Sequence, residues 1–433
     1  MLRIIFKQLL NRWKKNIWLA LELLLVFCLV WYMVDYFFVL AYNKNLSSYR
    51  DTHNTYMLDI GTFSEKNPGY DTDAAEPAVA LANFRRIIDR LKEYPEIESV
   101  AIAQHSSFPE LGSFSGSEYR NPEDTTRIAS VQHCTFAPEG DYLKVFRHTA
   151  DRGRKQVFLT DYDWGEPSHV LITRMMAEVL FSGEPATGKI IESTYKHPDH
   201  PRKQLRVAGV IDDVKRFDYL RPYSVIFIPE RLTESNYLSM MIGFRIKGNI
   251  PSADFIPAFK KEMGGPLQVG NFYLRDIRYF PKIEQETNAY MTNEIRVRTA
   301  IMSFFSLCVF LCVLGTFWYR VNMRREEVGI RRAMGADAYA IRKLFLLEGL
   351  LLLSLIVLPA MLIEMQFVYA GLIDTLGQES RSYGDYLPDH TAVRFLITNG
   401  ITWLLMSSVV LLAIWYPARS ASRIQPTEAL RDE

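Results

Sequence analysis

The sequence predicts a membrane α-helical protein with four transmembrane helices and a large extracytoplasmic α+β domain of two lobes. Three observations lead to this prediction: four long apolar segments, an uneven placement of Lys and Arg around them, and alternating helix and strand signals between the first two. The chain has 433 residues, of which 48% are hydrophobic and 23% are charged.

The four apolar segments are residues 17–41, 300–319, 344–372 and 395–416. Each reaches the ~20 residues that a helix needs to cross the hydrocarbon core of a bilayer. The first follows a basic leader, as in a signal peptide, but its length and the absence of an A-x-A cleavage site favour a retained span. The sequence therefore predicts an integral membrane protein.

Lys and Arg near the span ends set the orientation. Residues 1–16 hold five of them and residues 320–343 hold seven, whereas residues 374–394 hold two beside four acids. Basic segments stay in the cytoplasm, so both termini are expected inside and the long segment after span one outside. The expected parts are a cytoplasmic amphipathic segment (1–16), span one (17–41), an extracytoplasmic core domain (42–281), a stalk with span two (282–320), a cytoplasmic coupling loop or helix (321–343), span three (344–372), a short outer loop (373–394), span four (395–416) and a cytoplasmic tail (417–433).

The outer domain shows both helix and strand patterns. Apolar spacing predicts helices over 78–94, 172–181 and 252–263, the last capped by Ser252, and β-rich composition predicts strands over 97–103, 206–214, 223–230 and 239–248. Residues 104–165, which are poorer in periodic signal, are expected to form the second lobe. Residues 282–298 contain good helix formers and join span two without Pro or Gly, which predicts a continuous helical stalk.

The stretch FSGEPATGKII (181–191) lacks only the last letter of the phosphate-binding loop G-x-x-x-x-G-K-[ST], since Ile190 stands at the hydroxyl position. A phosphate loop needs a strand before it and a helix after it. Here a predicted helix precedes the glycines and a β-type run follows. We therefore interpret the stretch as a tight turn between a helix and a strand, with Gly183 and Gly188 supplying unusual backbone angles.

Other candidate sites in the outer domain have weak support. The near-neutral charge, 50 Lys and Arg against 49 Asp and Glu, argues against nucleic-acid binding. The segment HPDH (197–200) contains prolines typical of an exposed turn, which disfavours a metal site. The acid pairs Asp161 with Asp163 and Asp212 with Asp213 have no accompanying nucleophile, so no catalytic residue is predicted. Cys134, the outer domain's one thiol, is expected to be buried.

Four acidic residues lie in or near the spans: Glu22, Asp35, Glu348 and Glu364. Charge is costly in lipid, and such a residue deserves a functional hypothesis. Three of them lie near predicted span ends, where snorkelling or a contact between helices explains them better than ion transport. Glu364, close to Pro359, has no assigned role.

The cytoplasmic segment RVNMRREEVGIRRAMGADAYAIRKLFLLEGLL (320–351) predicts a short charged helix. Acids at its start and Arg331 and Arg332 at its end complement the helix dipole. Gly335 is suited to end this helix, and Asp337 to cap the next one, which runs into span three.

The motifs EEVGIRRAMGA and IRKLFLLEGLLL, together with the tail YPARSASRIQPTEALRDE, resemble the FtsX/MacB family of ABC-transporter permeases. Two outer stretches, VLITRMMAEVLFSGEPATGKII and VAGVIDDVKRFDYLRP, are similar to the family's periplasmic core region. The resemblance implies a non-catalytic permease in the bacterial inner membrane, driven by a separate ABC ATPase that binds ATP and Mg²⁺. It implies no cofactor and no metal bound by this chain.

The resemblance also implies which residues contact the ATPase and which other partners the permease has. The ATPase is expected to grip Glu326, Glu327, Val328, Gly329, Ile330, Arg331, Arg332, Met334, Gly335, Arg419, Arg423, Glu428 and Leu430, with Val328, Ile330 and Met334 filling an apolar notch. Small residues at Cys308, Cys312 and Thr316 favour close packing of span two in a dimer of identical or paralogous permeases. Membrane lipids, a periplasmic adaptor and an outer-membrane channel complete the expected partners.

Two functions follow from the resemblance. The first is MacB-like efflux of a drug, peptide or similar substrate by mechanotransmission, in which ATP hydrolysis moves the periplasmic domain. The alternative is FtsX-type signalling to a periplasmic hydrolase, or lipoprotein release. A membrane-anchored enzyme or receptor unrelated to ATPases is a third, weaker interpretation.

Overall fold

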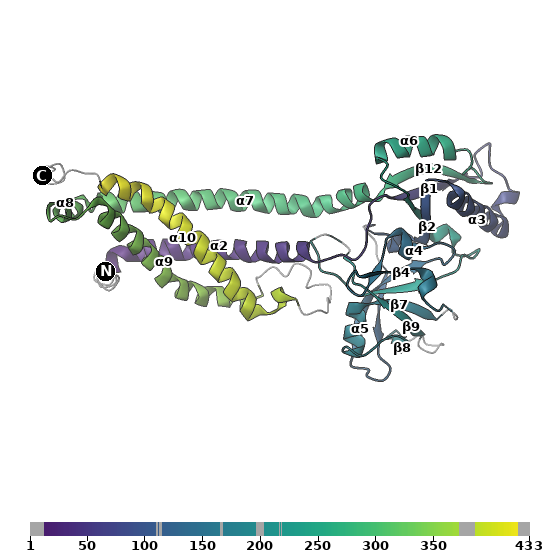
Figure 1. Ribbon diagram of the computed structural model, residues 1–433, viewed down its shortest axis with the longest axis horizontal. Helices are drawn as coiled ribbons and strands as arrows, with labels where there is room; N and C mark the ends of the chain where they lie inside the picture. Colours follow the sequence, from purple (N-terminus) through teal and green to yellow (C-terminus); the bar gives the residue numbers. More distant parts are fainter. Residues whose placement is uncertain are drawn as a thin grey trace. The chain divides into compact units, whose positions relative to one another are not determined.

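The computed structural model describes residues 13–109, 111, 115–164, 168–195, 203–215, 217, 219–371 and 386–422 (Figure 1). The chain divides into two compact units. The helical unit comprises Met1–Tyr42, Asn293–Leu376 and Asp385–Glu433, and the β-rich unit comprises Asn43–Thr292 with Gly377–Gly384.

The helical unit is built from long apolar helices. Its helices are α2 (Trp13–Asn45), α7 (Phe280–Asn322), α8 (Arg325–Ala333), α9 (Ala338–Tyr369) and α10 (Thr391–Ser422), with the short η5 (Leu387–Asp389) before α10. Four stretches are long and apolar enough to cross a membrane, namely Ile17–Asn45, Thr292–Tyr319, Ala338–Tyr369 and Thr391–Arg419. The four predicted spans are therefore confirmed as helices of spanning length.

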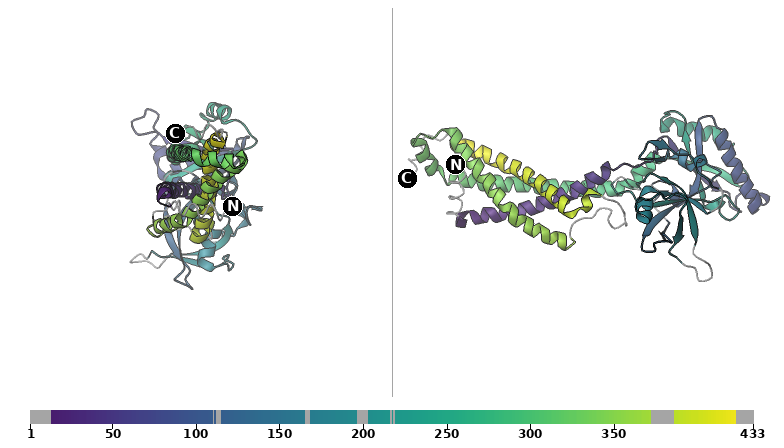
Figure 2. Two further views of the ribbon diagram at one scale, coloured as in Figure 1. Left: turned by 90° about the vertical axis from the view of Figure 1, so that its left-hand side faces the viewer. Right: turned by 60° about the horizontal axis from the view of Figure 1, so that its bottom comes forward.

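Buried side chains of α2, α9 and α10 form the core of the helical unit, in which α9 and α10 lie side by side (Figure 2). Phe27, Leu353 and Val410 are fully buried there. Helix α7 contributes fewer buried residues. Only 11% of the most apolar part of its span is buried, against 28% to 33% in the other three spans. Most of its apolar surface is left for lipid or for another protein.

The first lobe of the β-rich unit contributes four antiparallel strands to a ten-stranded sheet. It contains β1 (Thr55–Thr62), α3 (Pro77–Glu93), β2 (Ile97–Gln104), β11 (Met240–Ile246), α6 (Ser252–Met263) and β12 (Phe272–Tyr279), paired in the order β2-β11-β1-β12. This is the split βαβ arrangement, in which two strand-helix-strand units interlock. Its core lies between the sheet and the apolar faces of α3 and α6.

The second lobe is inserted between β2 and β11. Its strands are β3 (Gly116–Arg120), β4 (Ile128–Phe136), β7 (His169–Thr173), β8 (Ile190–Ser193), β9 (Gln204–Ile211) and β10 (Val225–Pro229). Because β10 pairs with both β7 and β4, the six strands close into a ring. Closure leaves these strands without a free edge. The lobe also contains α4 (Tyr142–Val145), the hairpin of β5 (Thr149–Ala150) and β6 (Lys155–Gln156), and α5 (Arg174–Phe181).

Four short 3₁₀ turns complete the β-rich unit: η1 (Asp73–Ala75), η2 (His105–Ser107), η3 (Leu159–Asp161) and η4 (Tyr237–Ser239). The predicted helices and strands match α3, α5, α6, β2, β9, β10 and β11 to within a few residues. The predicted second lobe was too short, because strands as far as β10 belong to it. The predicted Ser252 cap was wrong: Pro251 is the N-cap residue, and no side chain caps α6.

The C-terminal end of α2 is held by the second lobe. Lys215 is 5% exposed, and its Nζ donates hydrogen bonds to the carbonyl oxygens of Asn43, Lys44 and Leu46 at 2.8, 3.4 and 3.2 Å. An ammonium group suits this end, where helix carbonyls lack partners and the dipole is negative. The loop after β9 thereby fixes where the first span ends.

Candidate functional site

The short helix α8 lies between α7 and α9 in the chain and carries most of the residues expected to contact an ATPase. Glu327 and Arg331 form an ion pair of 2.8 Å along one face, spaced four residues apart. Arg324, just before α8, pairs with Glu348 of α9 at 2.6 Å, and the two side chains are 22% and 13% exposed. This second pair joins the start of α8 to the third span.

The two faces of α8 differ in what they contact. Val328 is 3% exposed and belongs to the buried cluster that contains Ile341 and Phe345 of α9. Ile330 and Met334 are 51% and 76% exposed. The structure therefore differs from the expectation for Val328, because its side chain anchors α8 to the helical unit and is unavailable to a partner. Gly329 is buried as well.

The turn after α8 has the predicted caps. Gly335 adopts φ +93°, a conformation that favours glycine. The backbone N–H of Ala336 donates to the carbonyl oxygen of Arg331 at 3.0 Å, which closes the turn. Asp337 is the N-cap of α9 and accepts a hydrogen bond from the backbone N–H of Ala340 at 2.8 Å. These contacts fix the path from α8 into the third span.

The remaining expected contacts are only partly visible. The side chains of Glu326 and Arg332, and all of Arg423, Glu428 and Leu430, lie outside the described residues. Arg419 is on α10, with its guanidinium 5.4 Å from the ring centre of Trp415. Glu327, Ile330 and Arg331 of α8, with Met334 just after it, are thus the described residues of this segment that remain for a partner to recognise.

Span two presents the residues expected to pack in a dimer. Cys308 and Cys312 are exposed on α7, near the exposed side chains of Phe304 and Leu311. Thr316 faces α2, because its hydroxyl donates to Glu22 at 3.2 Å, and the Cys312 thiol interacts with the same carboxylate. Two of the three predicted packing residues therefore lie beside the first span of the same chain, and Cys308 is exposed.

A buried ion pair joins spans one and four. Asp35 of α2 and Arg394 of α10 are 2% and 5% exposed, and Arg394 Nε donates to Asp35 Oδ1 at 2.8 Å. A second bond joins Arg394 Nη2 to Asp35 Oδ2, so the pair is bidentate. One turn further along, Trp31 Nε1 donates to the hydroxyl of Thr398 at 3.0 Å. The sequence left snorkelling and a contact between helices as alternatives for Asp35, and the structure shows the contact, with Arg394 as a partner that the sequence did not single out.

Glu364 of α9 is fully buried, and neither carboxylate oxygen has a hydrogen-bond partner among the described residues. Asn399 of α10 is 4% exposed, and its Oδ1 is also without a described partner. The interior of the helical unit therefore contains a buried carboxyl group whose polar neighbour is Asn399, and an ionised form is costly to keep in an apolar environment.

Residues 181–191, which resemble a phosphate loop in sequence, form a local turn between a helix and a strand. Helix α5 precedes it and strand β8 follows, the reverse of the order that phosphate binding uses. Gly183 and Gly188 adopt φ +85° and +87°, as predicted for a tight turn. Lys189 pairs with Glu184 and lies 4.8 Å from the ring centre of Phe181. Its ammonium group is thus engaged within the turn.

Of the other candidate sites in the β-rich unit, Asp212 has a structural role, and the HPDH segment is not among the described residues. Asp212 is 1% exposed and accepts hydrogen bonds from Thr149 Oγ1 and the backbone N–H groups of Arg152 and Gly153, at 2.9, 2.8 and 2.7 Å, and it also pairs with Arg174. It fastens the β5–β6 hairpin to β9. The HPDH segment lies outside the described residues, and within the described ranges no three His, Cys, Asp or Glu side chains gather as for a metal ion.

Comparison with known proteins defines the class of this molecule. Residues 299–426 match the family model of the FtsX-like permease C-terminal domain. Over 393 residues, 89% of the chain, the sequence is 25% identical to the macrolide export ATP-binding/permease protein MacB of Psychrobacter cryohalolentis and to that of Psychrobacter arcticus. The chain spans about half the length of these curated relatives, 52% in each case.

Two solved structures are also similar to part of the chain. The extracellular domain of the noncanonic ABC-type transporter YknZ from Gram-positive bacteria aligns with TM-score 0.30 and 16% identity, over 52% of this chain and 100% of that one. The periplasmic region of MacB from Actinobacillus actinomycetemcomitans aligns with TM-score 0.31 and 13% identity, over 55% and 93%.

Four helices of spanning length, a large β-rich domain and a matching permease domain define an integral membrane permease. More particularly, residues 299–426 match an FtsX-like permease C-terminal domain, and most of the chain is similar in sequence to the MacB relatives.

Proposed function

We propose that this permease couples ATP hydrolysis by a separate ABC ATPase subunit to movements of its β-rich domain. In this proposal the β-rich domain lies on the extracytoplasmic side of the cytoplasmic membrane. The movement serves efflux of a drug, peptide or similar substrate. The observation that carries this proposal is α8, a charged helix anchored on one face by Val328 and by the Arg324–Glu348 pair and exposed on the other. An anchored helix transmits force from a bound motor better than a loop does.

Three further observations support the coupling. Ile330 and Met334 offer exposed apolar contacts beside the Glu327–Arg331 pair, a combination suited to a partner groove with a polar rim. Helix α7 runs unbroken from the end of β12 through the second span. The MacB relatives are described as macrolide export ATP-binding/permease proteins, which favours an ATP-driven exporter.

The first test asks whether α8 receives the ATPase. The full chain is coexpressed with each ABC ATPase encoded in the same genome, and the purified pair is placed in lipid nanodiscs. Ile330→Glu and Met334→Glu together are expected to abolish copurification, because each places a charge in an apolar contact. Leu238→Glu, which alters a 71% exposed side chain of the β-rich unit, is the control and should leave binding intact. Equal copurification of all variants would exclude α8 as the docking helix.

The second test distinguishes export from signalling. The intact pair is assayed for ATP hydrolysis with and without a macrolide antibiotic, and a strain lacking its own macrolide exporters is scored for resistance. An exporter is expected to show stimulated hydrolysis and raised resistance. Cell-wall hydrolase activation without any cargo effect would instead indicate FtsX-type signalling, and release of lipoprotein from proteoliposomes would indicate lipoprotein release.

A further inference from the structure

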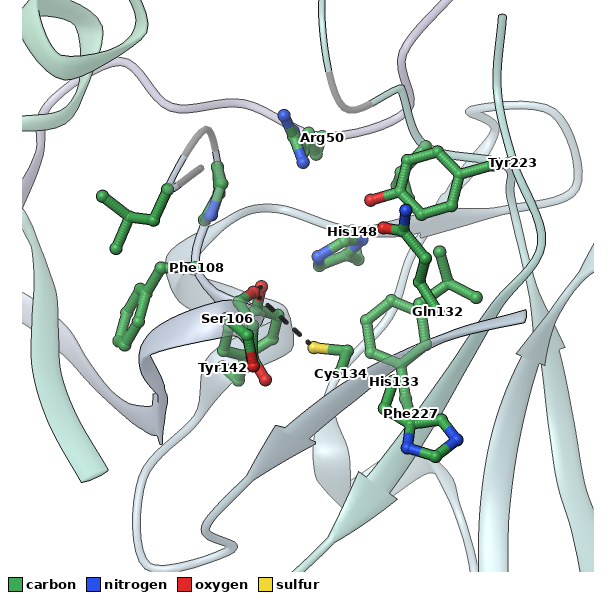
Figure 3. Close-up of a pocket in the computed structure, with 15 residues that line it drawn as sticks. Arg50, Ser106, Phe108, Gln132, His133, Cys134, Tyr142, His148, Tyr223 and Phe227 are labelled. Carbon is green, nitrogen blue, oxygen red and sulfur yellow. Dashed lines mark hydrogen bonds between the residues drawn. The ribbon is translucent and has the colours of Figure 1, made fainter. Parts of the chain in front are cut away.

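His148 and Glu364 are two buried ionisable side chains whose polar atoms all lack a hydrogen-bond partner among the described residues. His148 lies in a small pocket of the β-rich unit, beside Tyr142 and Phe227 (Figure 3). Burial lowers the pKa of His148 to about 3, so its ring is neutral at physiological pH and brings no charge into the pocket. Glu364 is the stricter case, because a glutamate in water is ionised at that pH.

Glu364 lies in the third span, and the sequence left it without a role. Its side chain is fully buried in the helical unit, whose core is made of apolar side chains from α2, α9 and α10. Both carboxyl oxygens lack a hydrogen-bond partner in the described part of the chain. An ionised carboxylate in such a place is strongly disfavoured. Glu364 therefore needs either a countercharge or a proton.

The charged groups around Glu364 do not supply a countercharge. In α10 the buried cation is Arg394, which pairs with both carboxylate oxygens of Asp35 in α2. Helix α2 also places Cys28 close enough to Glu364 to respond to its charge, but a thiol is not a cation. Residues 299–319 of α7 contain no Asp, Glu, Lys or Arg. A proton is consequently the better explanation for the buried carboxyl group.

Asn399 of α10 is the polar neighbour of Glu364. Its side chain is 4% exposed, and its Nδ2 donates a hydrogen bond to the carbonyl oxygen of Phe395 at 3.1 Å. Its Oδ1 has no partner among the described residues. A primary amide has two N–H donors and one carbonyl acceptor, so one N–H and the Oδ1 of Asn399 remain available. Three buried oxygens on two neighbouring helices thus lack a described partner.

The packing of α9 on α10 brings these polar side chains to the same level. A Cβ atom at Gly349 of α9 would lie 3.2 Å from Val410 Cγ1 of α10, and Trp403 Nε1 of α10 donates to Ser354 Oγ of α9 at 3.3 Å. Contacts therefore move to lower residue numbers in α10 as they move to higher numbers in α9. The two helices are antiparallel, and following them further in the same direction leads to the carboxyl group and the amide.

We propose that Glu364 is a proton-binding site of the helical unit, where its protonated carboxyl group and the side chain of Asn399 form an acid–amide pair. The Glu364 O–H donates to Asn399 Oδ1, and the available Nδ2–H of Asn399 donates to the other carboxyl oxygen. One proton thereby gives a partner to all three oxygens. A bound metal cation would call for more oxygen ligands than these three.

Proton binding also stabilises the contact between the third and fourth spans. Without the proton, a carboxylate faces the Asn399 carbonyl oxygen in an apolar core, and two acceptors cannot bond to each other. An arrangement of the spans in which water reaches Glu364 favours release of the proton, because a glutamate exposed to water is ionised at neutral pH. Occupancy of Glu364 and close packing of α9 and α10 are therefore coupled.

Solid-state NMR of the full-length chain in lipid bilayers reads the protonation state directly. Glutamate is ¹³C-labelled at Cδ, because the carboxyl carbon of a protonated acid resonates apart from that of a carboxylate. At neutral pH we expect a protonated signal that is lost in Glu364→Gln. Glu348 of the same helix, which pairs with Arg324, is the internal control. Its signal, assigned by Glu348→Gln, is expected at the carboxylate position, and a Glu364 signal at that position would overturn the proposal.

Labelling the asparagine side chains with ¹⁵N tests the acid–amide pair. Dipolar recoupling is expected to detect Glu364 Cδ beside Asn399 Nδ2, and the contact should vanish in Asn399→Leu. The Glu364 carboxyl signal should also shift in that variant, because its hydrogen-bond partner is gone. Ser407→Ala, which alters another buried α10 side chain whose polar atom has no described partner, is the matched control and should leave the signal in place. An unchanged Glu364 signal in Asn399→Leu would exclude the pair.

A change of salt separates a proton from a metal cation. The same spectra are recorded in sodium chloride and in choline chloride at equal ionic strength, and the protonated Glu364 signal is expected to be identical in both. A signal at the carboxylate position that moves with the sodium concentration would indicate a sodium site and contradict proton binding. Unchanged signals from the other glutamates check that each variant is folded, and Glu364→Gln keeps both the shape and the hydrogen-bonding capacity of the protonated acid.

Discussion

Asp35 and Arg394 show how a single residue in a span acquires a partner only through the fold. Each is costly in lipid, yet together they form a buried bidentate pair between α2 and α10. The pair lies in the same region of these helices as the Trp31–Thr398 hydrogen bond. Two polar contacts therefore fix the first span against the fourth.

Removing one member of this pair should destabilise the protein strongly. Asp35→Leu leaves Arg394 buried without its carboxylate, and we expect a loss of about 3 kcal/mol or more in the free energy of unfolding. The double variant Asp35→Leu with Arg394→Met removes both charges and should recover most of that loss. Thermal unfolding in detergent gives the comparison, and a double variant less stable than the single one would argue against the buried pair.

His148 predicts a defined dependence of stability on pH. Burial lowers its pKa from 6.5 to about 3, so the unfolded chain binds this proton first. The free energy of unfolding should therefore fall as pH drops from about 6.5 toward 3, by at most about 1.4 kcal/mol per pH unit from this group. His148→Phe should flatten the slope by up to one proton. Denaturant titrations in carboxylate-free buffers measure it, and identical slopes in both proteins would refute the assignment.

At the scale of elements, helix α8 shows the limit of pattern analysis. The charges and caps predicted a short helix, and the structure has one at Arg325–Ala333. Which face is free depends on the tertiary fold, because Val328 belongs to the buried cluster of the helical unit and α8 lies against α10. The exposed face is consequently defined by Ile330 and Met334.

Helices α9 and α10 approach closely at Gly349. A Cβ atom at this position would overlap Ile414 Cδ1 and lie 3.2 Å from Val410 Cγ1. Gly349→Leu should therefore lower the free energy of unfolding by about 1–3 kcal/mol through overpacking. Gly400→Leu is the matched control, since nothing lies within 4 Å of a Cβ atom there. Equal unfolding temperatures for the two variants would contradict close packing at Gly349.

At the scale of the whole molecule, helix α7, like α2, continues from one unit into the other. It spans Phe280–Asn322, so its first turns lie in the β-rich unit and the rest in the helical unit. Under the proposed function, this continuity carries motion from the ATPase to the β-rich domain. The prediction of an unbroken helix through residues 282–298 is confirmed.

Breaking α7 should separate ATP hydrolysis from movement of the outer domain. Ala289→Pro alters an exposed position and costs about 3 kcal/mol of local helix stability. With a fluorophore attached at Leu238→Cys in a chain whose four native cysteines are replaced, the ATP-dependent signal should be lost while ATPase binding persists. Ala289→Ser is the control and should keep the signal. A full signal from the proline variant would show that α7 does not transmit the motion.

Several parts of this architecture could be predicted because they depend on local chemistry. Apolar length predicted four spans, periodicity predicted α3 and α6, and positive φ at Gly183 and Gly188 follows from a helix that turns directly into a strand. The short helix α8 followed from its charges and caps.

The chain alone thus determined the number of spans, the α8 caps and the turn behind the apparent phosphate loop, since each arises from interactions within a few neighbouring residues. Tertiary structure decided the closure of the second lobe through the β4–β10 pairing, the partnership of Asp35 with Arg394, the inward face of Val328 and the pocket around His148. Each of these joins residues far apart in sequence, and no local pattern records which distant partner will fill the space.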